Sequence, residues 1–267
     1  MQILVKGKTI KEVELKLGEA IKKANLYYNK NSLLNNTTKT EIMLLTTRHK
    51  LNQQKDFKVK VSDGNTEEYI YGQEYLKILG ILIDQTLSWD KQISNIKKKA
   101  NNAIRNVHRA NHLLPMKQKR VLYDSLITPH FTYGDIIWNS CGKENSNKLQ
   151  QAQNYAAKSM LGVNRYSSSN EALKKLELLP LHEKRNIHTA VFVKKVLDGN
   201  APEEVKTMFD KQKRPANLRP GNLQLPKHKT HLYEKGPLYT ALKVWNSVPS
   251  NLKSSNQNLF KQQLQKR

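Results

Sequence analysis

The carboxylates are the side chains of this sequence most suited to catalysis, but their spacing does not pair them. Nucleotidyl or phosphoryl transfer with two Mg²⁺ ions requires neighbouring carboxylates that hold both metals. Asp84 and Asp90 flank a predicted turn, Asp124 and Asp135 are isolated, and no Asp-Asp pair occurs in the 267 residues. Glycine-rich phosphate loops and nucleophile elbows are also missing. The sequence therefore predicts no catalytic residue, no metal site and no cofactor for this chain alone.

Histidine and cysteine offer weaker candidates for a site. His108 and His112 are four residues apart on a predicted helix, which places both rings on one face, and His228 and His231 form a second pair. No third ligand accompanies either pair, so a metal is not expected. Cys141 is the single cysteine, which excludes an internal disulfide and indicates a reducing, intracellular setting. We expect it to be buried rather than nucleophilic.

Basic residues dominate the composition and indicate a polyanionic partner. Lys and Arg number 46 against 22 acidic residues, a formal net charge of +24. Residues 91–120 hold nine Lys or Arg and no acid. A Lys-Lys-Lys run is more often a solvated helix face, but thirty residues without a compensating acid favour phosphate binding. The candidate nucleic-acid-binding residues are Lys97, Lys98, Lys99, Arg105, Arg109, Lys117, Lys119 and Arg120.

The three tryptophans have two interpretations. Trp89, Trp138 and Trp245 could stack on bases. Each tryptophan lies beside an apolar run, however, and this position favours a side chain that packs in the core.

The first part of the chain predicts a helix and a small antiparallel sheet. Thr9 followed by Glu12 has the spacing of a capping box, and apolar residues recur behind it at helical intervals. Asp63-Gly64 is typical of a hairpin turn. The predicted elements are a helix over 10–30, a buried strand over 42–45, a strand over 57–61, and the apolar stretch 75–84 that completes the sheet.

The second part predicts mainly helices. Apolar residues from Trp89 onward form one stripe, and Pro115 and Pro129 are expected to end two successive helices. The stretch 130–141 is aromatic and partly strand-like. Predicted helices cover 90–114, 117–128, 146–161, 169–178, 181–197 and 238–245. Packing beyond residue 208 looks sparse, since four prolines lie in a basic background before the helix predicted at 238–245.

The amino-acid sequence predicts no membrane segment. It holds no apolar stretch of 18 or more residues and no signal-peptide pattern. We therefore expect an intracellular protein, nuclear or cytoplasmic.

Five motifs, in order, resemble one family. They are NSLLNNTTKTEIMLL, YLKILGILIDQTLSWDKQISNIKKKA, RVLYDSLITPHFTYGDIIWNS, LQQAQNYAAKSMLG and ALKVWNSVPSNLK. Each is modest alone, but their order and spacing resemble the C-terminal part of reverse transcriptases from LINE-type, jockey-like non-LTR retrotransposons.

The resemblance implies an α+β fold with four parts. Residues 1–87 would be a palm remnant with a small antiparallel sheet, one helix and a primer-grip-like hairpin at Leu79, Gly80 and Ile81. Asn36, Lys39 and Thr40 match the family's Asn…Lys-Thr palm element. Residues 88–130 would be a basic helical thumb, residues 131–207 a helical post-thumb region, and residues 208–267 a basic, proline-containing tail with a short helix.

The resemblance also implies a partner and a missing part. The partner would be an RNA/DNA template-primer duplex. The family's catalytic Asp-Asp turn would precede Met1, so Mg²⁺ is expected only in a full-length polymerase, and we expect this chain alone to be inactive. A missing N-terminal polymerase half would dock near Met1–Lys6. The alternative is a basic helical scaffold or adaptor without a nucleic-acid function.

Overall fold

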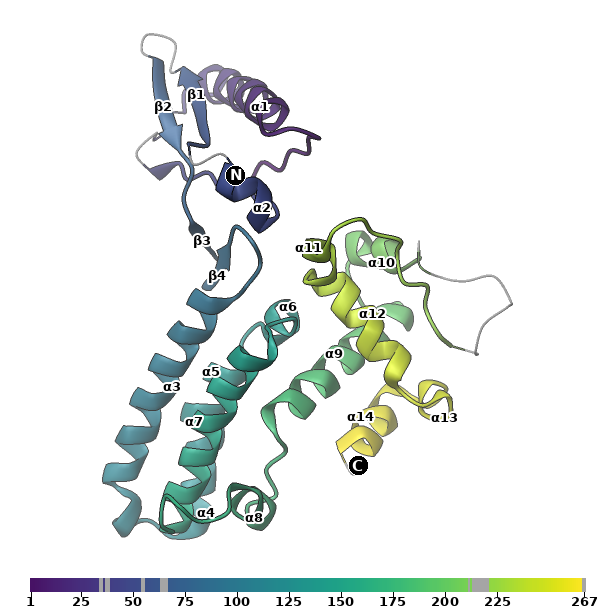
Figure 1. The fold of residues 1–267 in the computed structure, drawn as a ribbon. Helices are drawn as coiled ribbons and strands as arrows, with labels where there is room; N and C mark the ends of the chain where they lie inside the picture. The colour runs from purple at the N-terminus through teal and green to yellow at the C-terminus, as the bar shows by residue number, and fades with distance from the viewer. Residues whose placement is uncertain are drawn as a thin grey trace. The chain divides into compact units, whose positions relative to one another are not determined.

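The computed structural model describes residues 1–33, 36, 39–53, 56–62, 67–210, 212 and 221–265. The chain divides into two compact units, Met1–Thr86 and Leu87–Arg267. The first contains both helices and strands, and the described part of the second is helical (Figure 1). The α+β class predicted from the sequence is therefore confirmed.

The described residues of the first unit form two α-helices and two antiparallel pairs of strands. In chain order, the elements are α1 (Ile10–Lys30), α2 (Arg48–Gln53), β1 (Lys58–Ser62), β2 (Glu67–Tyr71), β3 (Tyr75–Ile78) and β4 (Ile81–Asp84). Strands β1 and β2 pair antiparallel, from Lys58 opposite Tyr71 to Ser62 opposite Glu67. Strands β3 and β4 form a separate antiparallel pair, from Tyr75 opposite Asp84 to Ile78 opposite Ile81.

Helix α1 has the predicted boundaries. At its N-terminus, the side chains of Thr9 and Glu12 accept hydrogen bonds from backbone N–H groups that have no partner within the helix. The backbone N–H of Glu12 donates to Thr9 Oγ1 at 3.2 Å, and Glu12 Oε2 accepts from the backbone N–H of Lys8 at 2.7 Å. Its buried face packs on β1 and belongs to a small apolar core. The buried members of this core are Leu17, Ile21, Ile42, Leu44, Phe57, Val59 and Val61.

Two expectations for the strands were wrong. The stretch 75–84 does not complete one sheet with 57–61, because it turns back on itself as the β3–β4 hairpin. Residues 42–45 do not form a strand: Ile42 makes an isolated bridge to Gly72, although Ile42 and Leu44 are buried as expected. The predicted turn at Asp63-Gly64 lies outside the described residues.

The second unit is a series of helices. They are α3 (Asp90–Arg109), the 3-10 helix η2 (Asn111–Leu113), α4 (Met116–Leu122), the π-helix η3 (Tyr123–Ile127), α5 (Thr128–Thr132), α6 (Asp135–Trp138), α7 (Lys143–Leu161), α8 (Ser169–Lys175), α9 (Leu181–Leu197), α10 (Glu203–Asp210), α11 (His231–Glu234), α12 (Pro237–Ser247), α13 (Ser250–Lys253) and α14 (Gln257–Gln265). Helix α9 has the predicted boundaries, and α7 starts three residues earlier than predicted.

Other helix boundaries differ from those predicted, and α8 ends at Lys175 rather than at residue 178. Helix α3 ends at Arg109 rather than at Leu114, and a short 3-10 turn carries the chain on to Pro115. Pro129 does not end a helix, because it lies in the first turn of α5, where a missing N–H costs little. The π-helix before it provides the change of pitch. The stretch 130–141, expected to be partly strand-like, contains the end of α5 and all of α6.

The C-terminal residues pack more tightly than the sequence suggested. Trp245, Leu242 and Phe260 are buried in one cluster with residues of α9 and α10. The indole N–H of Trp245 donates to the Gly221 carbonyl at 2.7 Å. The side chain of Asn246 accepts from the Leu223 backbone N–H at 2.9 Å and donates to its carbonyl at 2.8 Å. The expectation of sparse packing was therefore wrong for these described residues.

We predict that Leu242→Ala lowers the free energy of unfolding by about 2–5 kcal/mol, because Leu242 is 0% exposed and its truncation leaves a cavity. Urea denaturation followed by circular dichroism measures the change. The matched control is Leu259→Ala on α14, where the side chain is 44% exposed and a loss below about 1 kcal/mol is expected. Equal losses for the two variants would mean that this cluster is not a core.

Candidate nucleic-acid interface

Helix α3 separates apolar and basic side chains by its periodicity. Ile93, Ile96, Ala100, Ile104 and Val107 are buried along one stripe, as predicted. The opposite positions hold the cations of the basic segment. The side chains that could bind phosphates are therefore displayed on a helix whose other face is fixed in the core.

Hydrogen bonds between polar side chains connect α3 and its C-terminal end to α7, at both ends of the contact between the two helices. Near the start of α3, Asn145 Nδ2 donates to Asp90 Oδ1 at 2.6 Å. Near its end, His108 Nδ1 lies 2.7 Å from Ser159 Oγ, and Asn111 Nδ2 donates to the Ser159 carbonyl at 2.6 Å. The two helices consequently form the walls of a groove with a defined spacing.

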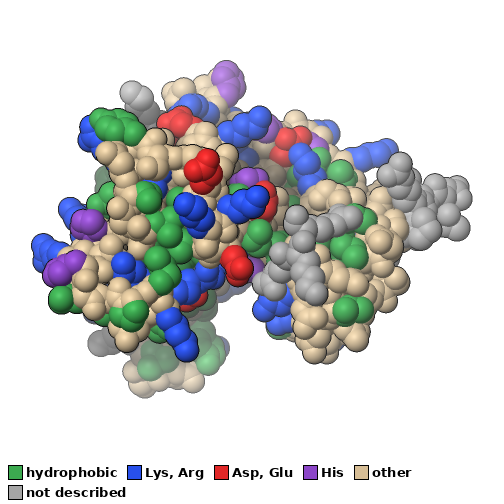
Figure 2. All heavy atoms as spheres, turned by 90° about the horizontal axis from the view of Figure 1, so that it is seen from below, with side chains coloured by type: hydrophobic (Ala, Val, Ile, Leu, Met, Phe, Trp, Pro, Cys, Tyr) green, Lys and Arg blue, Asp and Glu red, His purple; other side chains and the backbone are tan. Residues whose placement is uncertain are grey.

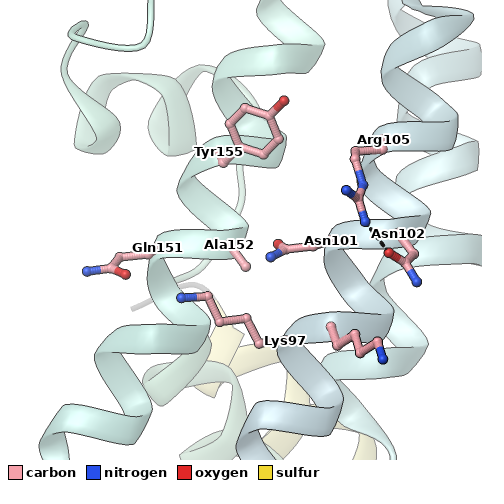
Figure 3. A pocket seen from close by; sticks show the side chains of 8 residues that line it. Lys97, Asn101, Asn102, Arg105, Gln151, Ala152 and Tyr155 are labelled. Atoms are coloured by element: carbon pink, nitrogen blue, oxygen red, sulfur yellow. Dashed lines mark hydrogen bonds between the residues drawn. The ribbon is translucent and has the colours of Figure 1, made fainter.

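The groove between the walls contains three of the predicted basic residues (Figure 3). It has a volume of about 450 Å³. Its lining residues are Lys97, Lys98, Asn101, Asn102 and Arg105 from α3, and Gln151, Ala152 and Tyr155 from α7. Lys97 and Asn101 point across the gap toward α7, and Tyr155 projects from the α7 wall (Figure 3).

The charge of this groove is not compensated by its own lining. Three cations and no acid are among the eight lining residues. The guanidinium of Arg105 donates to Asn102 Oδ1, which orients it without neutralising it. Elsewhere, Figure 2 shows Lys and Arg spread over the visible face with several Asp and Glu among them. An acid-free groove of this kind attracts anions such as phosphates.

Two other predicted basic residues, Lys119 and Arg120, make internal hydrogen bonds. Lys119 Nζ donates to the Met160 carbonyl at 3.3 Å, so a cation lies where the carbonyls at the C-terminus of α7 need donors. Arg120 Nε donates to Asp124 Oδ2 at 2.8 Å, and its guanidinium also donates to the Leu176 carbonyl.

The remaining basic candidates lie outside the groove lining. Arg109 and Lys117 are exposed. Lys99 is exposed too, and it acts electrostatically on His130. Burial, and secondly the charge of Lys99, lower the pKa of His130.

The palm-like residues Asn36, Lys39 and Thr40 form one local turn. Asn36 Oδ1 accepts from the backbone N–H of Lys39 at 3.1 Å, and Thr40 Oγ1 donates to the Asn36 carbonyl at 3.0 Å. This pattern is a side-chain-stabilised turn that leads toward the bridge at Ile42. Hydrogen bonds therefore connect the three residues within a turn and not within a strand.

The primer-grip-like residues lie at the β3–β4 hairpin. Leu79 and Gly80 form its two-residue turn with φ values of 46° and 86°, and Ile81 begins β4 as a buried residue. Positive φ at both turn positions matches the twist of a hairpin but is unfavourable for leucine. The side chain of Leu79 is nevertheless 85% exposed.

The histidine pairs and the cysteine do not form a metal or nucleophile site in the described part of the chain. His228 Nε2 and His231 Nδ1 each lie 2.8 Å from a different oxygen of Glu234, and His108 contacts Ser159. No cluster of three or more potential ligands occurs among the described residues. Cys141 is buried, which raises the pKa of its thiol.

The core interpretation of the tryptophans is confirmed. Trp89, Trp138 and Trp245 are each no more than 2% exposed.

Among the described residues, none of the helices combines the length and the apolar character that crossing a bilayer requires.

The sequence did not identify the α7 wall or the amides of the α3 wall. Gln151 and Tyr155 on α7 and Asn101 and Asn102 on α3 line the groove but were not among the candidates. The available signal was Tyr155, an aromatic residue that falls off the buried stripe of α7 formed by Leu149, Ala152, Ala156 and Met160.

A comparison of sequences identifies a related enzyme. Over 117 residues, the chain is 21% identical to the probable RNA-directed DNA polymerase from the transposon X-element of Drosophila melanogaster. This chain contains a reverse transcriptase-like region. The similarity covers 43% of this chain and 13% of that polymerase. No family model matches the chain, and no solved structure matches it either.

We predict that Arg120→Met lowers the free energy of unfolding by about 1 kcal/mol, because the variant loses two internal hydrogen bonds of a partly exposed cation. Lys97→Met changes the same charge in the groove, where no internal bond is lost, so a change within about 0.5 kcal/mol is expected. Urea denaturation distinguishes the two. A loss for Lys97→Met as large as that for Arg120→Met would assign Lys97 a structural role.

Proposed function

We propose that this chain is the C-terminal part of a LINE-type, jockey-like retrotransposon reverse transcriptase and binds an RNA/DNA template-primer through the groove between α3 and α7. The acid-free groove with three cations is the observation on which this function rests. The similarity to a transposon RNA-directed DNA polymerase supports nucleic acid as the polyanion. We propose that the chain acts in the nucleus or the cytoplasm of the cell.

In this proposal the phosphates are neutralised by Lys97, Lys98 and Arg105. Such contacts hold a nucleic acid without reading its bases, so binding is tolerant of sequence. Lys99, Arg109 and Lys117 extend the basic surface of the same part of the chain. We leave Lys119 and Arg120 out of the interface because their side chains bind internal carbonyls.

The finer assignments follow the family resemblance. The β3–β4 hairpin is proposed as the primer grip, with Gly80 as a point where nucleic-acid backbone approaches closely. Residues 1–87 are proposed as the palm remnant, residues 88–130 as the thumb, residues 131–207 as the post-thumb region and residues 208–267 as the tail. The compact units, Met1–Thr86 and Leu87–Arg267, divide near the first of these boundaries.

The alternative, a basic scaffold or adaptor, is less well supported. It accounts for the net charge but not for the similarity to a polymerase. It also gives no reason for cations to share a groove with amide and aromatic side chains.

Binding to an RNA/DNA hybrid is predicted to weaken as salt rises. Each phosphate contact contributes a slope of about −0.9 in a plot of log affinity against log salt, so the three groove cations predict roughly −2.7. Fluorescence anisotropy of a labelled hybrid, measured from about 50 to 200 mM NaCl, gives the slope. Affinity that stays constant over this range would contradict the proposal.

The groove is tested by Lys98→Ala, which is expected to make the slope shallower by about 0.9 and to weaken binding equally for hybrids of different sequence. The matched control is Lys175→Ala, which removes the same charge from an exposed position on α8 outside the groove. The same reduction for both variants would indicate a general effect of net charge.

We also propose that the chain alone does not polymerise DNA, since the 267 residues contain no Asp-Asp pair to hold two Mg²⁺ ions. The purified protein is expected to show no primer extension with Mg²⁺ and deoxynucleotides. Extension that disappears on chelation of the metal would contradict this.

A polymerase half that provides the aspartates is proposed to dock along residues 1–6. Met1 and Leu4 are 80% and 82% exposed, whereas Ile3 and Val5 pack on the core of the first unit. Alternation of this kind is typical of a sheet edge that another strand could pair with. Co-purification with a second chain that restores primer extension would support this docking site. If the Leu4→Lys variant restored primer extension equally well, residues 1–6 would not be the docking site.

A further inference from the structure

Tyr155 is the one aromatic residue in the lining of the groove between α3 and α7. It is 46% exposed, although Ala152, three residues earlier on α7, and the adjacent Ala156 are buried. Its side chain makes no hydrogen bond or ring contact within the described part of the chain. The ring therefore has a face available to a ligand in the groove (Figure 3).

The residues around Tyr155 suit two different parts of one ligand. Lys97, Lys98 and Arg105 attract negative charge, whereas Asn101 and Gln151 present both donors and acceptors. Asn101 points across the gap from α3 toward α7, and Gln151 lies on α7 about one turn before Tyr155 (Figure 3). A ligand that is anionic on one side and planar, with polar edges, on the other matches this arrangement, and a nucleotide strand has both features.

We infer that this groove binds an unpaired nucleotide strand, with a base stacked on Tyr155 and the adjoining phosphates held by Lys97, Lys98 and Arg105. This inference rests on the proposed function and deepens it, because it specifies a single-stranded segment of the nucleic acid, such as template that has not yet been paired.

The state of the bases separates a single strand from a duplex. In a duplex, each internal base is already stacked between its neighbours and hydrogen-bonded to its partner, so it cannot lie on a tyrosine ring without being extruded. An unpaired strand presents the faces of its bases freely, and stacking on an aromatic ring tolerates any base. The groove volume of about 450 Å³ is enough for one or a few nucleotide units of such a strand.

The test compares three labelled probes on the full chain: an oligothymidylate of about 12 nucleotides, an abasic strand of the same length, and a blunt RNA/DNA hybrid. Tyr155→Ala is expected to weaken binding of oligothymidylate by about five- to 100-fold and to leave the abasic strand and the hybrid within about twofold. Tyr155→Phe keeps the ring and is expected to bind all three probes as the unaltered protein does. Thermal unfolding of each variant verifies that the fold is retained.

Each other result has a defined meaning. Unchanged binding of oligothymidylate by Tyr155→Ala, together with salt-sensitive binding of the hybrid, would overturn this inference and leave the proposed function standing. An equal loss for the abasic strand would also overturn it, because the contact would then not involve a base. If no probe showed salt-sensitive binding, the proposed function would fail, and this inference with it.

Discussion

The packing of α3 against α7 is the constraint on which the candidate interface depends. Small buried residues, Ala100 on α3 and Ala152 and Ala156 on α7, allow the two helices to approach closely. Hydrogen bonds from Asn145 to Asp90 and from Asn111 to the Ser159 carbonyl then fix the contact at its two ends. Because the buried stripe of α3 can face only the core, the polar positions beside it must form one wall of the groove.

The same kind of residue has two different roles within a short segment. Lys119 and Arg120 donate to carbonyls of Met160 and Leu176, so their charges stabilise the ends of helical segments. Lys97 and Lys98 instead line a space that contains no acid. Chain position does not distinguish these roles; the distinction is the presence of an internal acceptor within reach of the side chain.

Local signals were sufficient for elements whose ends are determined by neighbouring residues. Helix α1 starts at a Thr9 cap and α9 ends at Asp198-Gly199, and both have the predicted boundaries. Other predictions failed, two of them at local features. Pro129 does not end a helix, because it lies in the first turn of α5, directly after the π-helix η3. The apolar stretch 75–84 forms its own hairpin, with Leu79 and Gly80 at positive φ in the turn, and does not extend the β1–β2 sheet. The proline-containing C-terminal part packs well because Trp245 and Asn246 find partners more than twenty residues away.

The sequence by itself determined that this chain is basic, mixed in its secondary structure and without paired aspartates, and that part of it is similar to a transposon RNA-directed DNA polymerase. It also placed Lys97, Lys98 and Arg105 on the polar side of one helix, since helical periodicity is a local property. Only the tertiary structure decided which cations share a groove, and that Tyr155, about fifty residues further along the chain, lies across from them. The physical reason is that a binding surface forms from side chains on different helices, and the packing of those helices is set by the core and not by any local pattern.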